Sequence, residues 1–138
     1  MKKLLSILTL TVAFIGLSAQ SLPSEATHFI STYFPENTIL EVHKEFSTNI
    51  TYRVQLDLNT MIGFDNEGSW LLIVTSEQTM PHTLIPTKIQ NYITSHEYAL
   101  SDIISYDRAR KNEVFVTMND DAILVFDQSG NYLRTTHN

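Results

Sequence analysis

The sequence contains no cysteine, and its 138 residues include only four glycines, four prolines and one tryptophan. Without cysteine the chain can form no disulfide, carries no thiol nucleophile and offers no attachment point for the lipid of a lipoprotein. This absence is compatible with an oxidising compartment, but it means that the hydrophobic core must stabilise the fold. A chain of this size can usually bury enough apolar surface to do so.

Basic residues are scarce too. The sequence has nine Lys and Arg residues against fifteen Asp and Glu residues, which gives a formal net charge of −6. An acidic chain repels the phosphates of nucleic acids and the headgroups of anionic lipids. We therefore expect neither nucleic acid nor a membrane surface as a partner.

The longest apolar run covers residues 4–17; two lysines precede it and Ser18-Ala19-Gln20 follows. It is shorter than the roughly 20 apolar residues of a membrane-spanning helix. A basic start, a short apolar run and small residues at its end are typical of a signal peptide. We predict a signal peptide over residues 1–20, cut after Ala19 or Gln20, and a periplasmic or secreted domain over residues 21–138 with no membrane span. Cleavage would change the formal charge from 9 − 15 = −6 to 7 − 15 = −8.

One short motif occurs twice. Residues 64–70 read FDNEGSW and residues 126–132 read FDQSGNY, at a spacing of 126 − 64 = 62. The Asp-x-x-Gly in each copy is typical of a tight turn, because an Asp side chain bonds the backbone two residues on and Gly tolerates a positive φ. We expect Asp65 with Gly68, and Asp127 with Gly130, to close matching turns between strands.

Hydrophobic spacing predicts a helix and four strands around each copy. Apolar residues at helical spacing indicate short helices over 22–34 and 85–93, and period-two alternation indicates strands. The expected strands cover 39–43, 52–57, a segment ending at Phe64, 70–75, 103–107, 114–118, a segment ending at Phe126, and 132–136. Links this short force antiparallel pairing. The predicted fold is α+β: tandem αββββ repeats, about 22–76 and 84–136, form a single domain whose antiparallel sheet carries two short helices packed on one face.

The same positions resemble a known family. The patterns LP…FI..YFP…I..V and Y.V.L…I.FD..G.W, followed by IP..I..YI and V.V.M…L.FD..GNY, are similar to the PepSY-like proteins of Bacteroidetes-type bacteria. The resemblance spans nearly the whole mature chain, although residues 95–100 lack the proline that follows the first helix. It implies a β-lactamase-inhibitor-protein-like fold and a secreted, non-enzymatic domain that restrains a peptidase or binds an envelope protein.

The usual catalytic motifs are missing from the sequence. There is no G-x-S-x-G, P-loop or G-x-G-x-x-G motif, and none of the five histidines lies three or four residues from another. His43, between Glu41 and Glu45, fits a solvated strand face better than a metal site, and the turn at Asp65 lacks the ligand spacing of a calcium loop. Two glycosidase carboxylates converge only in space, so that alternative stays open. We expect no enzyme activity, no metal and no cofactor.

The outward face of the predicted sheet differs between the halves. The alternation places Phe115, Ile123 and Val125 on the face away from the helices. The equivalent residues of the first half are Arg53, Met61 and Gly63. A contiguous apolar group on an open sheet face indicates a partner surface, although strands covered by a loop or by a second copy would give the same pattern. We predict a binding or inhibitory module for a periplasmic or envelope protein or peptidase, and a structural or small-ligand-binding protein is the alternative. The acidic surroundings predict a partner with a basic rim.

Overall fold

Eight antiparallel strands form one sheet, in which their spatial order equals their order along the chain. The computed structural model describes residues 22–46 and 48–137, so the predicted signal peptide over residues 1–20 lies outside the described residues. The elements are α2 (Ser24–Tyr33), β1 (Ile39–Lys44), β2 (Tyr52–Leu56), β3 (Thr60–Phe64), β4 (Trp70–Thr75), η1 (His82–Leu84), α3 (Thr87–Ser95), η2 (Leu100–Asp102), β5 (Ile103–Asp107), β6 (Glu113–Met118), β7 (Ala122–Asp127) and β8 (Tyr132–His137). The predicted α+β class, with an antiparallel sheet and two short helices, is confirmed.

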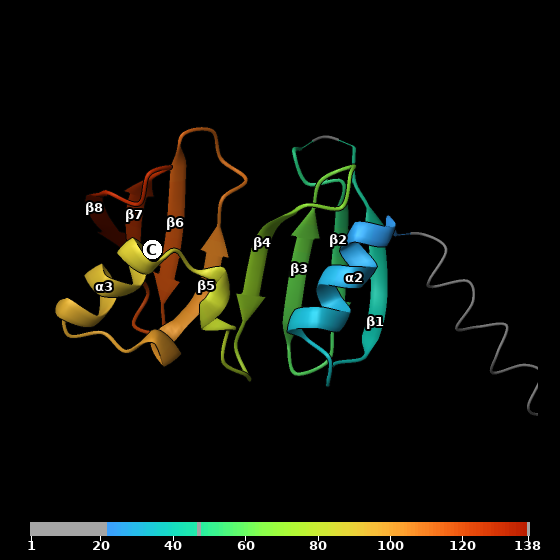
Figure 1. Cartoon of the computed structure of the whole chain (residues 1–138), viewed down its shortest axis with the longest axis horizontal. Helices are drawn as coiled ribbons and strands as arrows, with labels where there is room; N and C mark the ends of the chain where they lie inside the picture. Colours follow the sequence, from blue (N-terminus) through green and yellow to red (C-terminus); the bar gives the residue numbers. More distant parts are fainter. Residues whose placement is uncertain (1–21, 47, 138) are drawn as a thin grey trace, which may run out of the picture.

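Both α-helices lie on the same face of the sheet (Figure 1), α2 in front of β1 to β3 and α3 in front of β6 to β8. Each helix buries two residues spaced by four, Ala26 and Ile30 in α2 and Ile89 and Ile93 in α3. Residues at this spacing lie on one side of a helix. Because isolated helices this short are marginal in water, burial against the sheet is what stabilises them.

Phe64 and Phe126 are fully buried beneath the two helices. Each ring meets an aromatic ring of its helix edge-on. The centroids of Phe29 and Phe64 are 5.7 Å apart, and those of Tyr92 and Phe126 are 5.5 Å apart. This geometry suits the quadrupoles of aromatic rings. The period-two alternation of these strands also matches their burial, since Val54, Leu56, Ile62, Val116, Met118 and Leu124 are all buried.

The two Asp-x-x-Gly turns share one hydrogen-bond pattern. Oδ1 of Asp65 and Oδ1 of Asp127 each accept from the backbone N–H groups two and four residues on, all at 2.9 Å. Gly68 has a φ of 94° and Gly130 a φ of 85°. In the second turn, hydrogen bonds from the side chain and backbone of Asn131 lower the pKa of Asp127. Each turn therefore fixes the link between two strands by local chemistry.

Helix α3 ends without the proline that follows α2. Glu97 takes a φ of 69°, and the backbone N–H of Tyr98 donates to the carbonyl of Ile93 at 3.3 Å. A residue in this left-handed conformation is a common way to end a helix and turn the chain. The departure from the sequence pattern at residues 95–100 thus has a local explanation.

Strands β4 and β5 join the two halves. Their register pairs Leu72 with Asp107 and Val74 with Ser105. On the helix side, the rings of Trp70 and Tyr106 lie 5.5 Å apart. Because this pairing is unbroken, the face away from the helices is continuous from β1 to β8.

Candidate functional site

The face of the sheet opposite α2 and α3, which we call the open face, carries two complete rows of side chains. Successive residues of a strand point to opposite faces, so the register assigns each side chain to one face. The first row contains His43, Arg53, Gly63, Leu72, Asp107, Phe115, Val125 and Arg134. The second row contains Glu41, Gln55, Met61, Val74, Ser105, Thr117, Ile123 and Thr136.

The second row forms an uncharged stripe across six strands, β2 to β7. The uncharged stripe consists of Gln55, Met61, Val74, Ser105, Thr117 and Ile123, all of which are partly exposed. Covering such side chains costs little desolvation free energy compared with covering charged groups. Three of the six side chains, those of Met61, Val74 and Ile123, are apolar, and exposed apolar surface on a sheet face indicates an interaction site.

The register brings the predicted residues Phe115, Ile123 and Val125 together, and Phe115 lies directly opposite Val125. Phe115 and Ile123 are partly exposed, whereas Val125 has 0% exposure. The expectation that Val125 contacts a partner therefore needs correction, because its side chain is already covered.

An ion pair that spans β7 explains the burial of Val125. Arg134 on β8 donates from both terminal nitrogens to the carboxylate of Glu113 on β6, at 2.9 and 3.0 Å. Since β6 and β8 flank β7, these side chains can meet only above β7 on the open face. The hydrogen bonds lower the pKa of Glu113 and raise that of Arg134.

Ile50 covers part of the open face in the first half, and the sequence reading missed it. It lies in the loop after β1, is 5% exposed and does not belong to the helix-side core. A Cβ on Gly63 would stand 3.0, 3.1 and 3.3 Å from three side-chain carbons of Ile50. A signal was present, because a glycine inside a strand often marks the close approach of another group.

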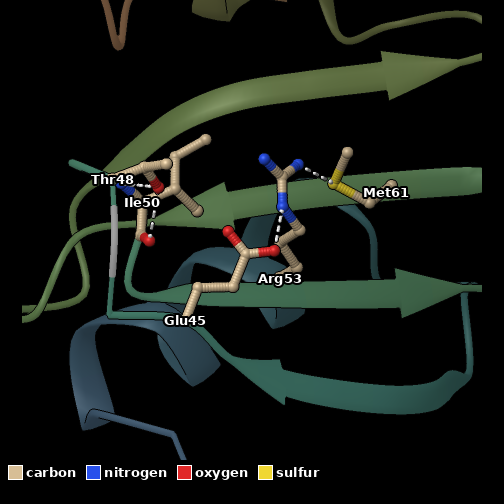
Figure 2. Close-up of polar contacts among 5 residues, drawn as sticks. All are labelled: Glu45, Thr48, Ile50, Arg53 and Met61. Atoms are coloured by element: carbon tan, nitrogen blue, oxygen red, sulfur yellow. Dashed lines mark hydrogen bonds and ion pairs between the residues drawn. The ribbon is translucent and has the colours of Figure 1, made fainter.

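A cleft of 530 Å³, which we call the loop cleft, opens between the loop after β1 and the loop after β5. Its lining consists of Thr48, Asn49, Ile50, Arg53, Asp107, Ala109, Arg110 and Lys111. Figure 2 shows the guanidinium of Arg53 between Glu45 and Met61, with helix α2 behind the sheet. Its Nε donates to Oε1 of Glu45 at 2.6 Å, and its Nη1 lies 3.9 Å from the sulfur of Met61.

Contacts between the two loops hold the cleft in shape. The side-chain amide of Asn49 donates to the carbonyl of Ala109 at 2.9 Å, across 60 residues of sequence. The guanidinium of Arg110 lies 4.3 Å from the ring centroid of Phe115, and its Nε is 3.7 Å from Oδ2 of Asp107. This cation–π contact places a charge beside the uncharged stripe.

The charge around the open face differs from the expected acidic surroundings. Of the seven Lys and Arg side chains among the described residues, four lie on or beside this face, namely Arg53, Arg110, Lys111 and Arg134. The lining of the loop cleft carries 3 − 1 = +2, while the described residues together carry 7 − 15 = −8. Four carboxylates lie on or beside the face as well, those of Glu41, Glu45, Asp107 and Glu113, so the open face is close to neutral. The acidic excess therefore lies mainly elsewhere, and the partner's rim need not be basic.

A smaller hollow of 290 Å³ lies beside α2 on the helix side. Trp70 lines it, but its ring is already packed: Phe29 stacks at 6.0 Å and the guanidinium of Arg108 lies 3.7 Å from the ring centroid. Nε of Arg108 also donates to the backbone carbonyl of Trp70 at 2.9 Å. The Trp70 ring in this hollow is therefore already occupied by contacts within the protein.

Within residues 22–46 and 48–137, no group of three or more His, Asp or Glu side chains is placed to hold a metal ion. In the same part of the chain, no helix has the length and hydropathy that a membrane span requires. The open face offers contact surface and cationic hydrogen-bond donors.

Comparisons with known proteins agree with the family that the sequence motifs resemble. A family model described as “Putative beta-lactamase-inhibitor-like, PepSY-like” matches residues 50–134. The crystal structure of a “putative periplasmic protein of unknown function” from Bacteroides vulgatus is 23% identical, with a TM-score of 0.72 over 85% of this chain and 93% of that one. A “putative calcium-regulated periplasmic protein” from Bacteroides thetaiotaomicron is 22% identical, with a TM-score of 0.73 over 86% of this chain and 92% of that one. At these identities the likeness concerns the fold. Among curated proteins, none matches this chain significantly.

Proposed function

Since the chain belongs to the PepSY-like family, we propose that it is a periplasmic, non-enzymatic binding module that holds a partner protein on the open face of its sheet. The partner is an envelope protein or a peptidase, which binding would restrain. The observation that carries this proposal is the uncharged stripe, a partly exposed row of six uncharged side chains on a face that the helices do not cover.

Two residues beside the uncharged stripe supply anchors for such a partner. Phe115 precedes Thr117 of the stripe by two positions on β6, and Arg110 lies against its ring. Arg and aromatic residues in the middle of an interface typically contribute a large share of the binding energy. Ile123, opposite Thr117, adds apolar area to the same spot.

The alternative is a protein that binds a small ligand, and the loop cleft favours it. A volume of 530 Å³ lies within the range of small-molecule sites, which is roughly 300–1,000 Å³. Such a ligand would raise the melting temperature without forming a protein adduct. A structural envelope protein belongs to the same alternative.

We further propose that residues 21–138 are one domain made by duplication of an αββββ unit, about 22–76 and 84–136, as in β-lactamase-inhibitor-like proteins. The matched turns at Asp65 and Asp127 support this proposal, as do the equivalent edge-on contacts of Phe64 and Phe126.

Site-specific photo-crosslinking in living cells tests the binding function. A photoreactive phenylalanine at Thr117 of the uncharged stripe should give a discrete higher-mass adduct, whose second component mass spectrometry identifies. The matched control places the same residue at Thr94, an exposed position on α3. Adduct formation at Thr117 should be lost when Ile123→Asp adds a charge to the stripe.

Two results would contradict the proposal. One is that Thr117 gives no adduct, or only the adducts that Thr94 gives. The other is that Ile123→Asp leaves the adduct unchanged, while circular dichroism shows that the variant is folded. A ligand-induced rise in melting temperature without any adduct would support the small-ligand alternative.

A further inference from the structure

The loop cleft concentrates positive charge in an otherwise acidic protein. Arg53, Arg110 and Lys111 line it together with a single carboxylate, that of Asp107. Adding Glu45, the ion-pair partner of Arg53, gives a local charge of 3 − 2 = +1 against −8 for the described residues. An anionic group would meet attraction here and repulsion over much of the remaining surface.

The cationic groups of the cleft keep donors available. Arg53 uses Nε for Glu45 and turns Nη1 toward the weak acceptor sulfur of Met61, while a guanidinium has five N–H donors. The contact of Arg110 with Asp107 is 3.7 Å long, and the Arg110 side chain is 65% exposed. The guanidinium groups of Arg53 and Arg110 can therefore both direct N–H donors toward a planar group with two oxygens, such as a carboxylate, which is the geometry that arginine binds best.

The position of the cleft ties it to the uncharged stripe. Arg53 and Asp107 belong to the first row of the open face, directly beside the stripe, and Arg110 covers Phe115. A chain that lies along the stripe would bring its own charged groups over the cleft. The hydrogen bond from Asn49 to Ala109 holds both walls before anything binds.

We infer that the loop cleft is a carboxylate subsite, which takes an acidic side chain or the C-terminal carboxylate of the partner. This inference rests on the proposed binding function and extends it, because it specifies the chemistry of the partner at one point. The predicted contact groups are the guanidinium groups of Arg53 and Arg110, with the ammonium of Lys111 at the rim.

Nuclear magnetic resonance on the folded protein tests the subsite directly. The probes are acetyl-alanyl-alanine, which has a terminal carboxylate, acetyl-glutamate amide, which has a side-chain carboxylate, and acetyl-glutamine amide, which has neither. We expect saturable shifts at the side-chain signals of Asn49, Arg53 and Arg110 with one or both carboxylates. The neutral probe should give none.

Two double variants separate the subsite from the overall charge. Arg110→Gln/Lys111→Gln and the control Lys44→Gln/Lys88→Gln remove the same charge, but only the first pair lines the cleft. The first variant should bind the carboxylate probe at least about tenfold more weakly, the loss expected when a charge-assisted hydrogen bond is removed. The control should keep most of its affinity.

The inference is overturned if the neutral probe shifts the same signals, if neither carboxylate probe binds, or if both double variants lose affinity equally. Its failure is distinguishable from that of the proposed function. If no carboxylate binds but the adduct at Thr117 still forms, only the carboxylate subsite is refuted. If a carboxylate binds but no adduct forms, the proposed partner surface is refuted and the carboxylate subsite is retained.

Discussion

Replacing Gly63 with alanine tests whether the loop after β1 is folded onto the open face. The new Cβ would stand 3.0, 3.1 and 3.3 Å from side-chain carbons of Ile50. Contacts this short require the neighbour to move, and Ile50 has little room because it is 5% exposed. We expect the variant to lose about 1–3 kcal/mol of unfolding free energy, the usual cost of overpacking.

In an Ile50→Ala background the same substitution should have the opposite sign. Ile50→Ala by itself should cost about 2–4 kcal/mol, since it removes a buried side chain and leaves a cavity. With that side chain gone, the Cβ at position 63 has space, and alanine is favoured over glycine inside a strand by roughly 0.5–1 kcal/mol. The two substitutions should therefore be coupled by about 1.5–4 kcal/mol, a large interaction energy of the kind found for residues in contact.

Urea denaturation of the four proteins of this cycle measures the coupling. Trp70 is the only tryptophan of the chain and is packed against Phe29 and Arg108, so its fluorescence reports unfolding. An equal effect of Gly63→Ala in both backgrounds would refute the contact between Ile50 and Gly63. It would also mean that Ile50 does not form part of the wall of the loop cleft.

The remaining predictions concern the two turns. Gly68→Ala should destabilise the protein more than Gly130→Ala, although both glycines have a positive φ. A Cβ at position 68 would stand 2.9 Å from the backbone nitrogen of Ala26, whereas the atom nearest to a Cβ at position 130 would be 3.4 Å away. Equal losses of unfolding free energy in urea denaturation would contradict this prediction. The lowered pKa of Asp127 means that its contribution to stability is present above the unfolded-state pKa of about 3.9 and is lost as the pH falls through the folded-state pKa. The difference in melting temperature between wild type and Asp127→Asn should therefore shrink as the pH falls from the unfolded-state pKa through the folded-state pKa. An NMR titration that gives the Asp127 carboxyl a pKa at or above the ordinary value would show the reasoning to be wrong.

The sequence was most informative where structure follows from local rules. Period-two alternation identifies the buried side of the strands that contain Val54 and Val116, because the two sides of those strands have different environments. The Asp-x-x-Gly pattern is similarly local, since every donor to Asp65 or Asp127 lies within four residues. Neither feature depends on how distant segments pack.

The exposure of residues on the open face was harder to predict, because the side chains that cover parts of this face come from distant positions in the sequence. Val125 is buried under an ion pair between residues 21 positions apart, Glu113 and Arg134, which no periodicity reveals. Ile50 lies in a loop, where alternation has no meaning. Leu72 and Val74 were missed for another reason: residues 70–74 of β4 read WLLIV, an apolar run that does not show which side faces the helices.

The loop cleft can exist only because the two halves share one sheet. One wall is the loop after β1 in the first half, and the other is the loop after β5 in the second. The two loops are far apart in the sequence. The β4–β5 pairing sets the distance between them, and the hydrogen bond from Asn49 to Ala109 joins them. The uncharged stripe crosses the same junction between Val74 and Ser105. Each half contains its own helix, turn and buried phenylalanine, but it contributes only half of the stripe and one wall of the cleft. The proposed binding function is therefore a property of the joined eight-stranded sheet, and substitutions that weaken the β4–β5 pairing should impair the stripe and the cleft together.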